Sequence, residues 1–378
     1  MDPQANISVV VDTDTAYGRE VLRGVSAYAH EIGRWLMRVR SIRTVWDGFP
    51  EASEAGLLVQ SLDLGFSQRL KDSGKPTVNI GDRVWGHPLP SVISDHRQIG
   101  ATAAQYLLTR GFTQLGFVGN QGHWYAEQRR DGFVGAARAA GCIVSECWVL
   151  QEPASRVTQP WLRDLTFPAG VLAAHDGLAR SLAYDCRILG IDIPSQVAII
   201  GVDNDVVQCE SAPVTLSSVA IAAQRIGYEA AALLDRLLAG DPPPGEPILV
   251  PPSTVVPRHS TDTLAVDDPY VTAALHYIQA NLAQRLNVDQ LAQHLGVSRR
   301  YLQQSFRRVL GRPPVAEIRL ARVQRAKELL ASTDMPIKRV AAACGFTDGP
   351  SFSRFFQRET SLCPSAYRQQ FRPSKSEP

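Results

Sequence analysis

The chain has 378 residues, of which 44% are hydrophobic and 20% are charged, an ordinary composition for a globular protein with room for two or three domains. Residues 267–378 hold 17 lysines and arginines against 9 acidic residues, a net charge of +8, whereas residues 1–266 hold 22 against 28, a net charge of −6. This separation of charge favours a polyanionic partner at the C-terminal end, and solvated charged faces are the alternative. No run in the sequence approaches the roughly 18 apolar residues that a membrane span needs.

The N-terminal residues lead directly into a strand-like run, without the basic and apolar regions of a secretion signal. The six cysteines form no C-x-x-C pair, and none stands near a histidine at the spacing of zinc ligands. We therefore expect a soluble, cytoplasmic protein with reduced thiols, no metal ion, no cofactor and no membrane contact.

Short apolar runs alternate with helix-like segments through the first two thirds of the chain. The runs are Ile7–Val11, Gly56–Val59, Thr77–Ile80, Leu115–Val118, Gly170–Ala173, Val197–Val202 and Ile248–Val250. The helix-like segments are Tyr17–Ile32, Gln98–Arg110, Glu127–Ala140, Gly177–Leu189 and Ala222–Ala239. Most runs are rich in β-branched residues, as strands buried on both faces are, so the alternation predicts an α/β fold with parallel sheets.

Polar side chains follow several of these predicted strands, at the sheet edge where ligands of open parallel sheets bind. The candidate ligand-binding residues are Asp12, Tyr17, Tyr125, Arg129, Asp176, Asp203 and Asn204. Carboxylates accept hydroxyl hydrogens, a guanidinium donates paired hydrogen bonds, and aromatic rings cover the C–H face of a sugar. This set of side chains favours a polyhydroxylated ligand.

Each candidate also has a purely structural interpretation. Asp176, like Asp95, precedes a predicted helix and fits an N-cap. Arg129 and Arg130 adjoin Asp131, so either arginine fits a surface ion pair, and the aromatic residues fit ordinary packing. The recurrence of polar residues after successive strands favours the ligand-binding interpretation.

Catalytic motifs are missing from the sequence, which holds no Walker A motif, no G-x-S-x-G and no H-E-x-x-H. Asp176 and Asp203 fit a glycosidase pair in residue type alone. We predict no catalytic residue, and keep a sugar-metabolising enzyme with a helical appendage as the alternative.

The alternation of strands and helices stops after Arg258, and only helical segments follow from Pro269 onward. These segments are Tyr270–Asn281, Val288–Leu295, Arg299–Leu310, Pro314–Ala331, Ile337–Cys344, Ser351–Thr360 and Pro364–Gln370. We expect a linker over residues 259–267, an all-α domain over residues 268–372 and a disordered tail over residues 373–378.

The all-α region begins with a helix, a glycine turn at Gly296 and a second helix capped by Ser298. The second helix has an apolar face of Leu302 and Phe306 and an opposite face rich in arginine and glutamine, whose forked groups match guanine and adenine edges. The predicted DNA-binding residues of this first helix-turn-helix unit are Ser298, Arg299, Arg300, Gln303, Gln304 and Arg307.

The same layout recurs around Gly345, with Phe352 and Phe356 on the apolar side of the second helix. The predicted DNA-binding residues of this second unit are Ser351, Ser353, Arg354 and Gln357. One unit alone also fits an ordinary helical bundle, but two copies with the same spacing in a domain of net charge +8 favour two helices that enter successive major grooves, about 34 Å apart.

Residues 267–370 resemble the DNA-binding domain of AraC-type transcription regulators. The resemblance rests on Ile337, Ala341, Gly345, Phe346, Ser351–Phe356, Pro364, Tyr367 and Arg368. It implies contacts with base edges at Arg300, Gln303, Gln304, Ser351, Ser353 and Arg354.

Residues 7–258 resemble the effector domain of LacI/GalR-type regulators, which is related to the periplasmic sugar-binding proteins. The matching segments are Asp95, Gly100, Leu107, Arg110–Phe112, Gly116–Gly119, Arg129, Gly132–Phe133, Gly201–Asn204 and Leu216–Val219. The resemblance implies a bilobed domain over residues 1–258, with one lobe of residues 1–95 plus 224–258 and another of residues 96–223. It also implies that Arg129, Asp176 and Asp203 bind sugar hydroxyls.

The two modules in this order resemble the xylose-responsive regulators along nearly the full chain. This resemblance implies D-xylose as the ligand, double-stranded operator DNA as the partner, and a homodimeric, nucleoid-associated activator that contacts RNA polymerase. The alternatives are a regulator of a different sugar and a DNA-binding protein without sequence preference.

Overall fold

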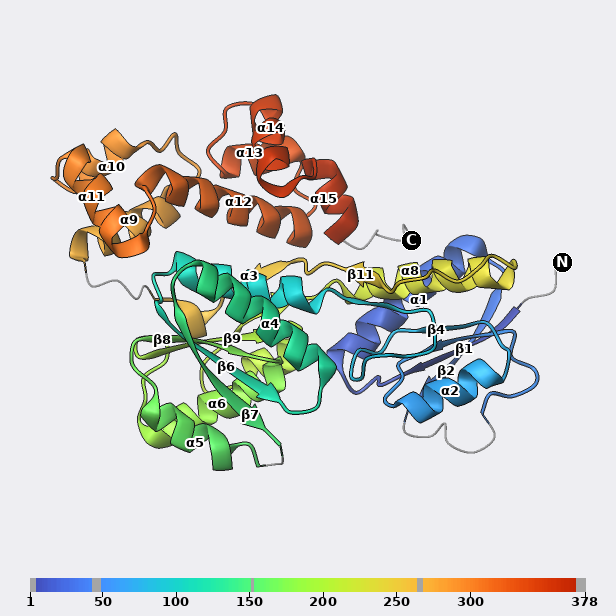
Figure 1. Cartoon of the computed structure of the whole chain (residues 1–378). Coiled ribbons are helices and arrows are strands. Elements are labelled where there is room, and N and C mark those ends of the chain that lie inside the picture. The colour runs from blue at the N-terminus through green and yellow to red at the C-terminus, as the bar shows by residue number, and fades with distance from the viewer. Residues whose placement is uncertain (1–4, 43–48, 151–152, 264–267, 372–378) are drawn as a thin grey trace.

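The computed structural model describes residues 5–42, 49–150, 153–263 and 268–371. These residues form two α/β lobes followed by a helical domain, which confirms the predicted fold class. The predicted tail and part of the predicted linker, residues 264–267, lie outside the described residues. Figure 1 shows the helical domain above the second lobe.

The first lobe contains a parallel sheet in the order β2-β1-β3-β4. Its strands are β1 (Ala5–Val11), β2 (Trp35–Ser41), β3 (Gly56–Val59) and β4 (Thr77–Asn79), and its helices are α1 (Ala16–Ile32), α2 (Leu64–Asp72) and α8 (Ala223–Leu238). Helices α1 and α8 cross at Gly24 and Gly227, where an added Cβ would lie 1.9 Å from the Gln224 carbonyl oxygen and 2.0 Å from that of Val21. Only glycine permits this approach.

The second lobe contains a larger sheet in the order β12-β10-β9-β8-β6-β7. Its strands are β6 (Gln114–Asn120), β7 (Ile143–Val149), β8 (Ala169–Ala173), β9 (Val197–Val202), β10 (Ser217–Ala220) and β12 (Thr254–Val256). Its helices are α3 (His96–Thr109), α4 (Trp124–Ala139), α5 (Ser155–Asp164), α6 (Asp176–Leu189) and α7 (Val206–Glu210). Residues 169–173 and 197–202 are buried throughout, as expected for central strands covered on both faces.

The chain passes between the lobes at β5 (Val92–Ser94) and β11 (Ile248–Val250), which pair in parallel. It then returns to the second lobe, where β12 pairs antiparallel with β10. The assignment of all residues from 224 to 258 to the first lobe is therefore wrong at β12. The short helix η2 (His259–Thr261) also folds onto the second lobe, with Ser260 and Thr261 fully buried, so these residues are not part of a linker.

The helical domain consists of α9 (Pro269–Ala280), α10 (Val288–His294), α11 (Arg299–Leu310), α12 (Pro314–Ser332), α13 (Ile337–Ala343), α14 (Gly349–Thr360) and α15 (Pro364–Phe371). It has two separate cores, and α12 contributes Ile318 and Ala321 to the first and Ala326, Leu329 and Leu330 to the second. The long helix thus joins two compact units. None of the helices in the described part of the chain is long and apolar enough to cross a membrane.

The helical domain rests on the second lobe through α12 and α15. The Gln324 side chain donates to Thr254 Oγ1 at 3.1 Å, and the Tyr367 hydroxyl donates to the Ser253 carbonyl oxygen at 2.5 Å. Strand β12 and the residue before it are therefore in direct contact with the helical domain.

Candidate ligand cleft and nucleic-acid interface

A buried polar cluster joins the two lobes. Arg129 on α4 is 3% exposed, and its Nε donates to His96 Nδ1 at 3.2 Å while its Nη2 lies 3.4 Å from Asp203 Oδ1. On its other side, His96 Nε2 lies 2.9 Å from Asp82 Oδ2, and Asp82 follows β4 in the first lobe. The cluster therefore contains side chains from both lobes at the carboxyl ends of their strands, as the sequence predicted for a ligand site.

Burial and neighbouring groups together set the protonation of His96 and Asp82 in this cluster. Burial lowers the pKa of His96 and outweighs the opposing effect of Asp82, so the imidazole is neutral. Burial alone would raise the pKa of Asp82, but His96 and Arg129 together lower it, so this carboxylate is ionised. Because His96 Nδ1 accepts from Arg129, the ring proton is on Nε2 and faces Asp82.

Two of the predicted aromatic residues lie beside the cluster. The Tyr17 hydroxyl donates to the Ile80 carbonyl oxygen at 2.6 Å, and burial raises the pKa of this phenol. The Arg129 guanidinium lies 4.9 Å from the centroid of the Tyr125 ring. Tyr17 and Tyr125 thus provide flat, largely apolar faces next to charged groups, an arrangement suited to a sugar.

The structure distinguishes a ligand-binding role from a surface ion pair at Arg129 and Arg130. Arg130 pairs with Asp131 at 3.1 Å and both side chains are about one third exposed, whereas Arg129 is buried in the cluster. The surface ion pair belongs to Arg130.

Asp176 lies below the cleft rather than on its wall. It is 1% exposed, and its carboxylate accepts from Ser218 Oγ at 2.7 Å and from the Asp205 backbone N–H at 2.8 Å. Burial, followed by repulsion from Asp203, raises its pKa to about 7. The N-cap of α6 is His175, one residue earlier, whereas Asp95 does cap α3. The contacts of Asp176 hold the loop after β9 in place.

That loop carries Asp203 and Asn204. Burial raises the pKa of Asp203 to about 6, against the opposing effect of Arg129. The Asn204 side-chain oxygen accepts from Arg258 Nη2 at 2.8 Å, so this amide is occupied by a protein partner. Asp12 lies in the loop after β1, where its carboxylate accepts from the Asp14 backbone N–H at 3.1 Å. Of the seven predicted residues, Tyr17, Tyr125, Arg129 and Asp203 come together most closely.

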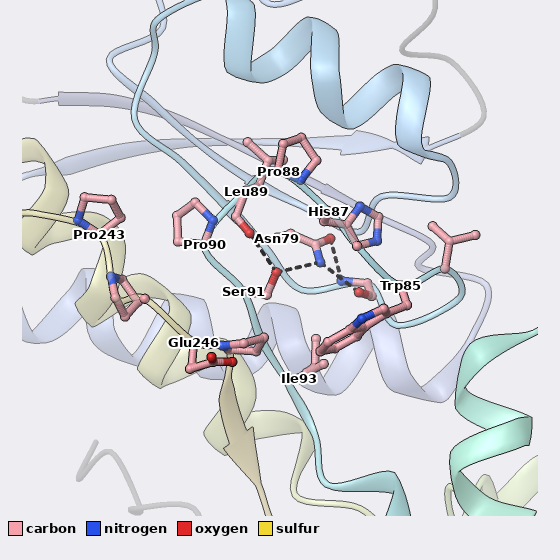
Figure 2. A pocket seen from close by; sticks show the side chains of 16 residues that line it. Asn79, Trp85, His87, Pro88, Leu89, Pro90, Ser91, Ile93, Pro243 and Glu246 are labelled. Atoms are coloured by element: carbon pink, nitrogen blue, oxygen red, sulfur yellow. Dashed lines mark hydrogen bonds between the residues drawn. The ribbon is translucent and has the colours of Figure 1, made fainter.

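A separate cavity of about 350 Å³ lies in the first lobe, between residues 84–91 and the turn of residues 243–247 (Figure 2). The Asn79 side chain supports its wall by donating to Ser91 Oγ at 3.1 Å. The cavity adjoins the loop that carries Asp82, but its lining includes none of the predicted ligand-binding residues.

The first predicted DNA-reading helix is α11, which has the Ser298 cap, with Ser298 Oγ accepting from the Tyr301 backbone N–H at 3.1 Å. Gly296 has φ +67°, the left-handed conformation that the tight turn before α11 requires. Leu302 and Phe306 are fully buried. The predicted DNA-binding residues Arg299, Arg300, Gln304 and Arg307 are exposed, and Gln303 is half-buried.

The second predicted DNA-reading helix is α14, whose N-cap is Asp348, earlier than the sequence indicated. Arg354 and Gln357 are exposed, and Ser351 and Ser353 are half-buried. Gly345 at the preceding turn has φ +79°, and an added Cβ would lie 2.6 Å from the carbonyl oxygens of both Leu282 and Gln284. The second unit thus packs closely on the loop after α9 in the first, which fixes one relative to the other.

Arg322 of α12 strengthens this junction. Its Nη2 donates to the Gln284 carbonyl oxygen at 3.1 Å, and its guanidinium lies 5.4 Å from the centroid of the Phe346 ring. The α11 and α14 faces that carry Arg300 and Arg354 stay open to solvent, so the helical domain is not a closed bundle around them.

Asp82, His96 and Arg258 were not among the residues predicted from the sequence. Asp82 follows the predicted strand Thr77–Ile80, and the rule applied to the other strands would have found it. His96 and Arg258 also follow strands, β5 and β12, but these two short strands were not predicted from the sequence, so the rule did not reach them.

Comparison with known proteins agrees with this two-part organisation. Residues 104–261 match the family model of a periplasmic binding protein-like domain, and residues 291–370 match that of a helix-turn-helix domain. The chain is 29% identical over 391 residues to the xylose operon regulatory protein of Haemophilus influenzae, covering 96% of this chain and 97% of that protein. The protein of the same name from Escherichia coli K12 is 29% identical over 382 residues, covering 96% of each.

One solved structure aligns with nearly the whole chain, and another aligns with part of it. A structure of the xylose-binding transcription activator xylR aligns with a TM-score of 0.64 at 27% identity, covering 98% of this chain and 100% of that chain. The complex of the transcriptional regulator CelR with cellobiose aligns with a TM-score of 0.58 at 22% identity over 69% of this chain and 86% of that chain, an agreement in fold.

Proposed function

We propose that this chain, which joins a periplasmic binding protein-like domain to a C-terminal helix-turn-helix domain, is a sugar-responsive DNA-binding regulator of xylose genes. One observation carries the proposal. Arg129 is buried at the junction of two lobes, beside Asp203 and His96, in the same chain as two exposed basic recognition helices.

D-xylose is the ligand that the cleft is proposed to take. The carboxylates of Asp203 and Asp82 offer acceptors and the guanidinium of Arg129 offers a donor, a set of groups that matches the adjacent hydroxyls of a pentose. The contact of 3.4 Å between Arg129 and Asp203 is long for a charge-assisted hydrogen bond, so a hydroxyl group can replace it at little loss. Relatives that cover nearly the whole chain are named for xylose, which favours this sugar over others.

The helical domain is proposed to read double-stranded operator DNA with α11 and α14. Arg300, Gln304 and Arg354 stand on the exposed faces of these helices, where they can meet base edges in two successive major grooves. We further propose that the protein acts in the cytoplasm as a nucleoid-associated homodimeric activator that contacts RNA polymerase, and that it does not chemically alter the sugar.

Calorimetric titration of D-xylose into the full chain tests the sugar site, with L-arabinose and D-glucose as comparison sugars. We expect saturable binding of xylose by the wild-type protein and none by Arg129→Gln. The matched variant Arg130→Gln removes a neighbouring arginine outside the cleft and is expected to bind as the wild type does. Nuclear magnetic resonance of xylose after long incubation with the protein tests for turnover. Conversion of the sugar, or equal binding by Arg129→Gln, would contradict the proposal.

A further inference from the structure

The loop after β9 is held in an unusual backbone conformation. Asp203 and Asn204 have φ values of 103° and 54°, a region that residues other than glycine seldom adopt. Three hydrogen bonds maintain it: Ser218 Oγ accepts from the Asn204 N–H at 2.9 Å and donates to Asp176 at 2.7 Å, and Asp176 accepts from the Asp205 N–H at 2.8 Å. Such strain persists only where surrounding contacts impose it, and it is typical of ligand sites and switches.

The two residues of this loop face different parts of the molecule. Asp203 meets Arg129 in the ligand cleft, whereas the Asn204 side chain accepts from Arg258 Nη2 at 2.8 Å. Arg258 lies two residues after β12, the strand that returns to the second lobe before the chain leaves for the helical domain. Asp203 therefore lies in the cleft, and Asn204 is bonded to Arg258, in the segment through which the chain leaves the effector domain.

Arg258 is fixed at both its side chain and its backbone. Its Nη1 donates to the Leu216 carbonyl oxygen at 2.8 Å, and its backbone N–H donates to Ser217 Oγ at 2.7 Å. With the bond to Asn204, the side chain spans the loop after β9 and the start of β10. A displacement of the loop must therefore move Arg258 or break its bond to Asn204.

The segment after Arg258 is fixed to the second lobe, and the segment before it contacts the helical domain. After it, Thr261 is buried and bonds through Oγ1 to Ser217 Oγ at 2.7 Å and to the Tyr106 hydroxyl at 2.8 Å. Before it, the Thr254 hydroxyl of β12 accepts from Gln324 on α12. Arg258 thus lies between the cleft loop and the strand on which the helical domain rests.

We propose that Arg258 is the positioning residue that transmits the state of the ligand cleft to the DNA-binding domain. When a sugar hydroxyl replaces Arg129 as the partner of Asp203, the loop of residues 203–205 shifts, and the bond between Asn204 and Arg258 carries the shift to β12 and η2. This role rests on the proposed function, because it requires both a sugar in the cleft and DNA on the helical domain.

The experiment measures the coupling between the two sites rather than either affinity alone. D-xylose is titrated calorimetrically into the full chain, first alone and then saturated with a DNA duplex that the wild-type protein has selected from a random-sequence library. The ratio of the two dissociation constants is the coupling factor, which is about 5- to 150-fold in typical allosteric proteins. The variants are Arg258→Lys, which keeps the charge but loses the forked bonds to Asn204 and Leu216, and Asn204→Gly, which removes the acceptor and suits the positive φ.

We expect both variants to bring the coupling factor close to one, and the double variant to lose no more than either single variant, because the two residues act through one bond. The matched control is Arg97→Lys on α3, whose guanidinium also bridges to another helix, at Gln128 and Asp131, but away from this route; it should keep the wild-type factor. A wild-type factor retained in Arg258→Lys and Asn204→Gly would overturn the role of Arg258 alone. A factor of one in the wild type would overturn the proposed function as well.

Discussion

Trp85 and Trp124 stack across the two lobes, with ring centroids 4.6 Å apart and ring planes 19° from parallel. Trp85 lies in the loop after β4 of the first lobe, and Trp124 begins α4 of the second. The Trp124 backbone N–H also donates to the Arg83 carbonyl oxygen at 2.9 Å. These contacts join the loop that carries Asp82 to the helix that carries Arg129, so the structure represents the lobes in contact around the polar cluster.

The stack is expected to stabilise the sugar-bound form. Because the stack joins the two lobes, Trp85→Ala removes a contact that holds them together around the cleft, and xylose binding is expected to weaken by about 0.5–1.5 kcal/mol. Trp85→Phe retains a ring and should lose less. Calorimetric titration of xylose into each variant measures the difference, and an unchanged affinity in Trp85→Ala would show that the stack does not contribute to closure.

Arg129 is expected to support folding as well as binding. Arg129→Gln leaves the buried His96 ring and the half-buried Asp203 carboxylate without their cationic partner, so the free energy of unfolding should fall by about 1–3 kcal/mol. Arg130→Gln breaks only partly exposed pairs, with Asp131 and Glu146, and should change it by about 0–1 kcal/mol. Urea unfolding of both variants provides the comparison. Equal stability of the two would mean that the cluster is solvated and unpaired in solution.

The contribution of Asp176 and Asp203 to the stability of the sugar-free protein is expected to fall as pH rises from about 4 to about 7. Burial raises the pKa of Asp176 to about 7 and that of Asp203 to about 6, from the ordinary value of 3.8. At a pH below the ordinary value of 3.8, both carboxyl groups are protonated in the folded and in the unfolded chain, so their raised pKa values cost no stability. Above it the unfolded chain releases protons that the folded chain retains, so stability is lost with a slope of up to about 1.4 kcal/mol per pH unit for each group.

Asp176→Asn should reduce this slope, because an amide does not titrate, while its oxygen still accepts from Ser218 or the Asp205 N–H. Urea unfolding across the same pH window gives both slopes. Identical pH dependence in the variant and the wild type would mean that Asp176 is already ionised in the folded protein at low pH.

The second helix-turn-helix unit is expected to contribute sequence readout. Arg354→Ala should weaken binding to a duplex selected by the wild-type protein by about 1–3 kcal/mol and leave binding to a scrambled duplex nearly unchanged, because base contacts discriminate and phosphate contacts do not. Fluorescence anisotropy with the two duplexes at fixed salt measures both values. Equal losses on both duplexes would instead favour DNA binding without sequence preference.

Helix bounds in the C-terminal domain were predictable because local signals set them. The predicted helix Arg299–Leu310 agrees with α11 at both ends, since Ser298 caps its start and Gly311, with φ +69°, ends it. The signals for α14 were weaker: Asp348 caps it, and Gly349 and Pro350 form its first turn, so the helix begins two residues before the predicted start. Here the cap and the proline were better guides than the apolar spacing.

Elements at the edges of the sheets were missed for a physical reason. Strand β2 is an edge strand, and Arg38 and Arg40 interrupt its apolar pattern. Strand β7 is another such case, with Ser145 and Glu146 in its middle. A search for fully apolar runs finds central strands, which are covered on both faces, and passes over strands with a solvated side.

The cleft was predictable only in part. Arg129 and Asp203 follow strands and were found by position, whereas the bond from Arg258 to Asn204 joins residues 54 positions apart and has no local pattern. The burial of Asp176 likewise depends on β10, whose Ser218 occupies its carboxylate. Sequence position indicates which residues gather at a sheet edge, but the tertiary contacts decide which of them face the ligand.

The proposed link between a sugar in the cleft and DNA on the helical domain is tested most directly through thermodynamic linkage. The affinity of the full chain for its selected duplex is measured by fluorescence anisotropy with and without saturating D-xylose. Xylose is expected to change this affinity by the same factor by which the duplex changes the affinity for xylose. An affinity for the duplex that xylose leaves unchanged would contradict the proposed link.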